Sequence, residues 1–301
     1  MTAENIKLVI VSGDPFLFYN ACRLKKETGC KVILDYRDLW NDHSYYKLHY
    51  TLTRAQEAFF EEAENTSLSE CDAVITVDAH LKEVIGKRLP EGSRHKIHVI
   101  QNGFDADDFN FPLPSNKSNK PKTILYFAGN IASDLNEIIF DFIRCFAELK
   151  QKLPDIYSKF EIHLKGKMDA PLFEKLRSFQ LENLILQNSF VPLKTYSSEV
   201  SECDMGIIIL SKEYANSYTT KFGDYLFLDK KILVLGHKGA FSDFVLENNF
   251  GEIFIPGDNY SFFERLNISK VNSGFGAEIK EKFNINSLTD KVISVFESLS
   301  S

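Results

Sequence analysis

Short apolar runs of strand length alternate with helical stretches almost from the first residue, and this alternation restricts the folds open to the chain more than any other feature. In the first half the predicted strands are Lys7–Ser12, Lys31–Tyr36, Ala73–Val77 and Ile97–Ile100. Such short, continuously apolar strands between helices are typical of a parallel sheet covered on both faces. The pattern therefore predicts an α/β fold.

The second half repeats the alternation more completely. Its six predicted strands are Thr123–Ala128, Phe160–Leu164, Leu184–Gln187, Gly206–Leu210, Ile232–Leu235 and Glu252–Ile255. Six alternating strands make a full doubly wound domain. A βα unit with its return strand needs about 30 residues, so the first half is expected to be an incomplete domain, short by one to three units.

A polar segment separates the two halves. Residues 115–122 read SNKSNKPK, contain a proline and lack large apolar side chains, which is typical of a domain boundary. The expected organisation is an N-terminal Rossmann-like domain over residues 1–114, a linker over 115–122 and a C-terminal Rossmann-like domain over 123–301.

Charge and cysteine usage exclude several classes of function. The chain has 35 basic and 42 acidic residues, a net charge of −7, which argues against sequence-independent binding to nucleic acid. No apolar run reaches the roughly 18 residues of a membrane-spanning helix, and the N-terminus lacks the features of a signal peptide. Five cysteines without a CxxC pair indicate buried, reduced thiols in a cytoplasmic protein rather than a zinc site.

Six segments, taken in order and with their spacing, resemble the GT-B glycosyltransferases of family 4. They are ILDYRDLW (33–40), CDAVITVDAHL (71–81), IHVIQNGFDADDF (97–109), ILYFAGNI (124–131), CDMGIIIL (203–210) and TTKFGDYLFLDKKILVLG (219–236). The resemblance implies two Rossmann-like domains, of which the C-terminal one binds a nucleotide sugar and the N-terminal one mostly binds the acceptor. It also implies retention of anomeric configuration, with no resident cofactor or metal.

The resemblance places the diphosphate of the donor beside Gly129 and Asn130, which follow the strand Thr123–Ala128. Family members often carry two basic residues after this glycine, and this chain carries neither. Lys165, Lys167 and Lys221 are the candidates to replace them, with Lys221 the best placed. Lys165 and Lys167 could equally be solvated surface residues.

Other donor contacts follow from the same resemblance. Asp224 is expected to accept hydrogen bonds from the ribose hydroxyls, because a carboxylate offers two acceptor oxygens and no competing donor. Asn216 occupies the place of a family glutamate that holds the sugar, with Glu213 as a nearby alternative. Phe190 and Val191 lie in the loop that reads the nucleotide base, or in a plain strand-exit loop.

On the acceptor side, the expected residues are Asp14, Arg37, Asp38 and His43, which follow predicted strands of the first half. Arg37 and Asp38 could instead form a structural ion pair. Asp105 and Asp107 imitate a metal-binding DxD motif, but they lie in the connection between the domains and receive no metal role.

The sequence thus predicts a cytoplasmic glycosyltransferase that transfers a sugar to a saccharide or lipid-linked acceptor in surface polysaccharide synthesis, with peripheral contact to the inner membrane face. Two alternatives stay open. The chain could be an inactive or accessory subunit whose partner completes the N-terminal domain, or it could be a nucleotide-sugar epimerase.

Overall fold

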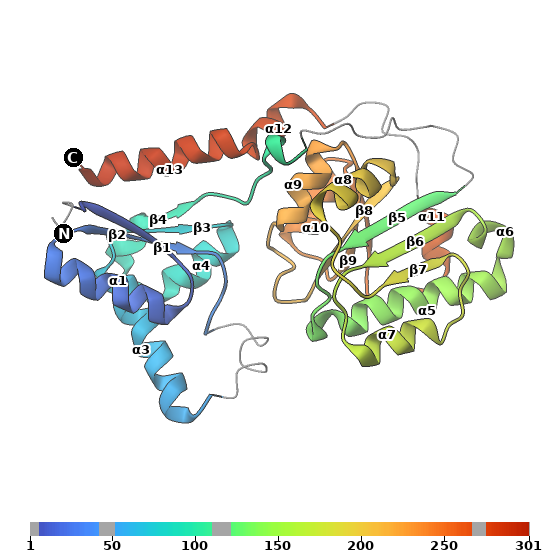
Figure 1. Ribbon diagram of the computed structural model, residues 1–301, viewed down its shortest axis with the longest axis horizontal. Coiled ribbons are helices and arrows are strands. Elements are labelled where there is room, and N and C mark those ends of the chain that lie inside the picture. Colours follow the sequence, from blue (N-terminus) through green and yellow to red (C-terminus); the bar gives the residue numbers. More distant parts are fainter. Residues whose placement is uncertain (1–5, 42–51, 110–121, 267–274, 301) are drawn as a thin grey trace. The chain divides into compact units, whose positions relative to one another are not determined.

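The computed structural model describes residues 6–41, 52–109, 122–266 and 275–300 (Figure 1). The chain divides into two compact units, the first comprising Met1–Asn102 and Asn286–Ser301 and the second Gly103–Ile285. Each unit has its own parallel β-sheet, with four strands in the first and six in the second. The predicted α/β class is confirmed, and the ten predicted strands are present with ends shifted by at most one residue.

The first unit alternates strands and helices and ends with the C-terminal helix of the chain. Its elements are β1 (Leu8–Ser12), α1 (Pro15–Thr28), β2 (Lys31–Tyr36), α3 (Arg54–Glu70), β3 (Ala73–Thr76), α4 (Ala79–Arg88), the 3-10 helix η1 (Glu91–Lys96), β4 (Ile97–Val99) and α13 (Ile285–Ser300). The strands pair in the sequential order β1-β2-β3-β4.

Local signals fix the ends of these helices. The Asp14 side chain accepts a hydrogen bond from the Leu17 N–H, and Pro15 occupies the first turn of α1, where no N–H is needed. Gly29 ends α1 in the left-handed conformation at φ +74°. Thr53 and Gln56 form a reciprocal capping box at the start of α3.

The two faces of the first sheet are covered by different helices. One face packs against α1, α3 and α4 through side chains such as Phe18, Leu68 and Leu81. The other face packs against α13, whose Leu288 and Val295 are buried beside Ile33 and Ile75 (Figure 1). The C-terminal helix is therefore part of the first unit.

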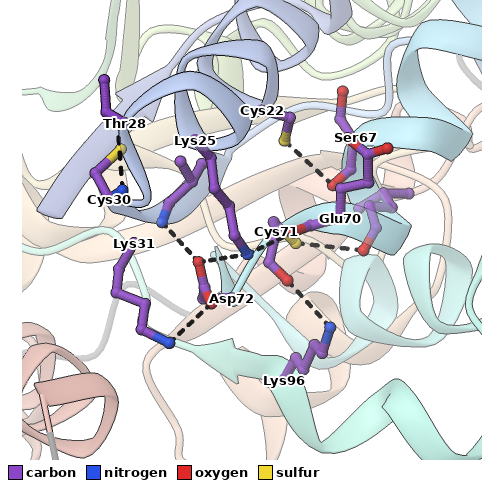
Figure 2. A network of polar contacts seen from close by, with 12 residues as sticks. Cys22, Lys25, Thr28, Cys30, Lys31, Ser67, Glu70, Cys71, Asp72 and Lys96 are labelled. Carbon is purple, nitrogen blue, oxygen red and sulfur yellow. Dashed lines mark hydrogen bonds and ion pairs between the residues drawn. The ribbon is translucent and has the colours of Figure 1, made fainter.

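A polar network ties the amino-terminal side of this sheet to its helices (Figure 2). The Asp72 carboxylate accepts hydrogen bonds from the Val32 N–H at 2.8 Å and pairs with Lys25 at 2.8 Å and Lys31 at 3.3 Å. Burial opposes ionisation of Asp72, but these contacts outweigh it and lower its pKa. The Lys25 ammonium also donates to the Glu70 carbonyl, which links α1 to the end of α3.

The cysteines in and around this network are thiols. All five cysteines of the chain are buried and free, as predicted. Cys22 and Cys71 donate weakly to the Ser67 and Leu68 carbonyls, and burial raises their pKa values to about 11 and about 12. Neither is a reactive thiolate at neutral pH.

The second unit has the larger sheet. Its elements are η2 (Ala106–Phe109), β5 (Thr123–Ala128), η3 (Ser133–Leu135), α5 (Asn136–Lys152), α6 (Pro154–Tyr157), β6 (Phe160–Lys165), α7 (Ala170–Arg177), β7 (Leu184–Gln187), α8 (Leu193–Glu202), β8 (Met205–Leu210), α9 (Thr220–Phe227), β9 (Lys231–Gly236), α10 (Ala240–Glu247), β10 (Gly251–Phe254), α11 (Ser261–Arg265) and α12 (Ala277–Lys282). The strand order is β10-β9-β8-β5-β6-β7.

Alternate side chains of β5 enter two separate hydrophobic cores. Leu125 and Phe127 pack with α5 on one face of the sheet, whereas Tyr126 and Ala128 pack with α8, α9 and α10 on the other. Helices thus cover both faces, as in a doubly wound domain.

The unit boundaries differ from the expected ones. The second unit begins at Gly103 and ends at Ile285, instead of running from residue 123 to 301, because α13 buries its apolar side against the first sheet. The expected linker, residues 115–122, lies outside the described residues except for Lys122.

The packing of α13 generates a first prediction. Leu288→Ala should lower the free energy of unfolding of the first unit by about 2–5 kcal/mol, because it leaves a cavity against the sheet. The measurement is urea denaturation of the full chain, followed by hydrogen exchange in peptides covering β2 and β3. Ile293→Ala is the matched control, since Ile293 lies on the same helix and is 44% exposed. Equal effects of the two substitutions would contradict the packing described.

A close backbone contact in the second unit generates another prediction. Gly166 has φ +120°, and a Cβ added there would lie 2.0 Å from the Gly129 carbonyl oxygen. Gly166→Ala should therefore push apart the loops after β5 and β6, and should cost about 1–3 kcal/mol more than Gly257→Ala. Gly257 has φ +94° but nothing within 4 Å of the added Cβ, so it isolates the backbone strain. Thermal unfolding of both variants makes the comparison, and similar losses would rule out the steric argument.

Candidate functional site

The strand order of the second unit places a candidate site at the carboxyl ends of β5 and β8. From β5 the chain builds outward through β6 and β7, and then returns to pair β8 with the opposite side of β5. Loops leave neighbouring strands in opposite directions at such a reversal, and ligands of open α/β sheets bind there. The loop after β5 carries Gly129, and the segment after β8 leads into α9, which carries Lys221 and Asp224.

Lys221 lies directly over Gly129. Its Nζ is 2.7 Å from the position that a Cβ of residue 129 would occupy, so a side chain at this position would displace the ammonium. The ammonium lies 5.2 Å from the centre of the Phe127 ring, and no described carboxylate forms an ion pair with it. Burial lowers the pKa of Lys221, and the nearby Asp224 carboxylate opposes this shift. A half-buried cation without an ion-pair partner in the described chain is suited to an anionic ligand.

Asp224 lies one turn further along α9. Its Oδ2 accepts a hydrogen bond from the Tyr196 hydroxyl at 2.9 Å, which leaves Oδ1 for other donors. The pKa of Asp224 is raised, mainly by burial and to a smaller extent by the Asp108 carboxylate. The Tyr196 hydrogen bond and the Lys221 ammonium oppose this shift. The predicted pair of Lys221 and Asp224 is therefore brought together on one side of α9, with opposite charges at i and i+3.

The backbone after β5 is partly occupied. The Gly129 N–H donates to the Lys165 carbonyl at 2.9 Å, so it extends the sheet and is already used. Asn130 is exposed, and its N–H has no hydrogen-bond partner among the described residues. Of the predicted Gly129–Asn130 pair, Gly129 supplies the space and Asn130 supplies the free donor.

Lys165 is buried in a polar network. Its Nζ donates to Glu199 Oε1 at 2.6 Å, and Glu199 Oε2 accepts the Tyr126 hydroxyl at 2.7 Å. Only 9% of Lys165 is exposed. The ammonium is thus neutralised by Glu199, whereas Lys167 is exposed two residues further along.

The remaining predicted donor residues differ in their surroundings. The Asn216 Oδ1 accepts the Ala240 N–H at 2.8 Å, so this side chain caps α10. Phe190 is 87% exposed in the loop after β7, and Val191 is buried in the core with Tyr196. Phe190 presents its ring to solvent, and Val191 has only its backbone to offer a ligand.

In the first unit, the predicted acceptor-side residues lie at the carboxyl ends of the strands. Asp14 follows β1 and caps α1. Arg37 follows β2, and its guanidinium donates to Asp35 at 2.6 Å and to Asn102 at 3.1 Å. Arg37 pairs with Asp35, while Asp38 has other interactions and is not free. His43 lies outside the described residues.

Tyr196, Glu199 and Asp108 are the site residues that sequence reasoning missed. Tyr196 and Glu199 come from α8, whose distance from Asp224 and Lys165 depends on how α8 packs over the sheet. No local motif marks them. Asp108 follows the Asp105 and Asp107 pair directly and could have been considered with it.

The described part of the chain has neither a cluster of metal ligands nor a membrane-spanning helix. Among the described residues, no three His, Cys, Asp or Glu side chains are grouped so that they could hold a metal ion. The Asp105 carboxylate accepts the Asp107 N–H and so shapes its own turn. No helix in the described ranges is both long enough and apolar enough to span a bilayer.

Comparisons with known proteins point to one family. Residues 1–108 match the model for Glycosyltransferase Family 4. A search of curated protein sequences finds no match.

Several solved structures share the fold. One of them is described as trehalose-6-phosphate from E. coli bound with UDP-2-fluoro glucose. It aligns with a TM-score of 0.62 at 10% identity, over 97% of this chain and 70% of that chain. TarM has a TM-score of 0.60 at 13% identity, over 97% and 55%. A Listeria monocytogenes protein assigned as a UDP-N-acetylglucosamine 2-epimerase has a TM-score of 0.57 at 13% identity, over 99% and 75%.

At these identities the structural likeness shows the fold, and the match to the family model covers residues 1–108. The chain has a parallel sheet in each of its two units, and a lysine and an aspartate lie near the switch point of the second sheet. These features agree with the shared fold and with the family match. The chain therefore has the two-unit GT-B fold of these structures, and its residues 1–108 are similar to the glycosyltransferases of family 4.

Proposed function

We propose that the chain transfers a sugar, with retention, from a nucleotide diphosphate sugar held in the second unit to a saccharide or lipid-linked acceptor in surface polysaccharide synthesis. The observation that carries the donor assignment is Lys221, a half-buried ammonium over Gly129 with no ion-pair partner in the described chain. A diphosphate placed there meets a compact positive charge and the free Asn130 N–H.

In this proposal the chemistry is mainly charge stabilisation and positioning. The bond between the anomeric carbon and the diphosphate breaks, and an acceptor oxygen bonds to the same face of that carbon. The acceptor proton passes to the departing phosphate, and the nucleoside diphosphate leaves. Lys221 stabilises the negative charge that grows on the phosphate as the bond breaks, so no side-chain base and no resident cofactor are required.

Asp224 holds the nucleoside end. Its Oδ2 is occupied by the Tyr196 hydroxyl, and Oδ1 remains to accept ribose hydroxyls. Phe190, exposed in the loop after the edge strand β7, would offer a ring for the base. Asp14, Arg37 and Asp38 would contact the acceptor. We place the reaction in the cytoplasm, at the inner membrane face, which is consistent with five buried thiols.

For the ribose anchor we expect Asp224→Ala to weaken binding of a nucleoside diphosphate by roughly 10- to 150-fold, because a charge-assisted hydrogen bond contributes about 1.5–3 kcal/mol. Isothermal titration of UDP, GDP and ADP first identifies the base in the unmodified chain and then measures the loss. Glu247→Ala, an exposed carboxylate on α10, is the charge-matched control. Unchanged affinity in Asp224→Ala would remove Asp224 from the site.

For the phosphate contact we expect Lys221→Ala to lower kcat by about 100-fold or more while donor affinity falls much less, because the interaction strengthens as charge develops. Sugar transfer and donor hydrolysis are measured for the unmodified chain and for this variant. Lys167→Ala tests the exposed alternative on the next loop. A drop in Lys167→Ala with normal turnover in Lys221→Ala would reverse the assignment.

A second candidate function follows from β1. Among the described strands, β1 lies at the edge of the first sheet and pairs only with β2, and Ile10 in its centre is 46% exposed. An uncharged, open edge can accept a further strand, so a partner subunit could complete the first sheet. Nucleotide binding without transfer or hydrolysis of any nucleotide sugar would favour this accessory role.

The epimerase alternative has the fold in its favour but not the family match. It predicts a new sugar epimer from a nucleotide sugar without any acceptor. Analysis of the products by NMR separates it from transfer.

A further inference from the structure

A cavity of about 520 Å³ lies along the edge strand β4 of the first unit. Three elements besides β4 contribute side chains to it: Lys82 comes from α4, His95 from η1, and Lys291 from α13. It belongs entirely to the first unit and includes none of the residues assigned to the donor or to the acceptor. Its volume falls within the range of small-molecule sites.

The charged groups that line this cavity are all basic. Lys82, Lys291, His95 and His98 contribute to its wall, and no carboxylate does. Neither lysine forms an ion pair with any described residue, and both are exposed, so both ammonium groups can move to a ligand. This basic lining contrasts with the net charge of −7 of the whole chain.

The two histidines add donors that respond to a ligand. The His98 ring has no hydrogen-bond partner among the described residues, and burial together with Lys82 and His95 lowers its pKa. His95 uses Nδ1 to contact the Gly92 carbonyl at 2.8 Å, which leaves Nε2 for a ligand. An anion beside the His98 ring would favour its protonated form and so gain a hydrogen bond as it binds.

The rest of the wall is apolar or already hydrogen bonded. Ile97 and Val295 are buried at its base. Ser294 and Ser298 lie on one face of α13 with Lys291, but their hydroxyls donate to the Asp290 and Val295 carbonyls. The donors left for a ligand are therefore the cationic groups, and the serines can only accept.

We propose that this cavity binds a phosphate group, carried either by a free phosphorylated small molecule or by a lipid headgroup. Basic groups approach from four elements, and a phosphate offers three strong acceptor oxygens where a carboxylate offers two. The apolar base suits a neutral part of the same ligand. The proposal does not depend on the donor site in the second unit.

The test follows the histidine ring resonances of the full chain by NMR. One titration uses glycerol 3-phosphate, and a second uses vesicles of phosphatidylglycerol with phosphatidylcholine vesicles as the neutral reference. We expect one of these ligands to shift the His98 and His95 signals and to raise the pKa of His98, while His237 in the second unit does not respond. The Lys82→Gln, Lys291→Gln double variant should bind at least tenfold more weakly.

The matched control is Lys152→Gln with Lys159→Gln, which removes the same charge from two exposed lysines of the second unit that form no ion pair with any residue that the structure describes. A response to glycerol 3-phosphate identifies a free ligand, and a response to phosphatidylglycerol alone identifies a headgroup. The proposal is overturned if neither ligand shifts His98, or if the two double variants weaken binding equally, since overall charge would then be the cause.

Discussion

The pairing of β8 with β5 is the contact on which the proposed donor site depends. β5 already pairs with β6, so placing β8 on its other side reverses the direction in which the sheet is built. This reversal brings α9 over the end of β5, and with it the Lys221 ammonium over Gly129. In the unfolded chain these residues are separated by about ninety positions, and only the sheet order makes them neighbours.

The same arrangement explains why the site can hold opposite charges in a partly buried place. Burying a charge costs free energy unless another group compensates it. The Tyr196 hydroxyl compensates Asp224, and Glu199 compensates Lys165. Of the three charged side chains, Lys221 alone has no direct partner among the described residues. The Asp224 carboxylate acts on it from a distance, and the Phe127 ring lies beside it. A phosphate would supply the missing counter-charge, which is why we assign the anion to Lys221 and not to Lys165.

The first unit handles polar groups differently. At the amino-terminal side of its sheet, the Asp72 carboxylate is fully paired with Lys25, Lys31 and the Val32 N–H (Figure 2). This network therefore has a structural role. Along β4, in contrast, Lys82 and Lys291 have no acidic partner in the described chain.

Glu64 is a third kind of charged group in this unit, because it is buried and only partly compensated. It is fully buried on α3 beside Arg88, and burial raises its pKa to about 7. The distinction between satisfied and unsatisfied groups separates the structural network from the candidate phosphate site.

The sequence by itself determined the strands and the α/β class and carried the resemblance to family 4, because apolar runs, caps such as Asp14 and Gly29, and short motifs are local properties of the chain. It also made Lys221 and Asp224 candidates for the donor site, and their i, i+3 spacing on a helix is local. Tertiary structure alone decided the rest. That α3 buries Glu64 among its exposed acids, that Arg37 pairs with Asp35, that Asn216 caps α10 and that α13 belongs to the first unit all follow from packing between distant segments. Such contacts depend on sheet order and on which helix face is covered, and neither is encoded at any single position.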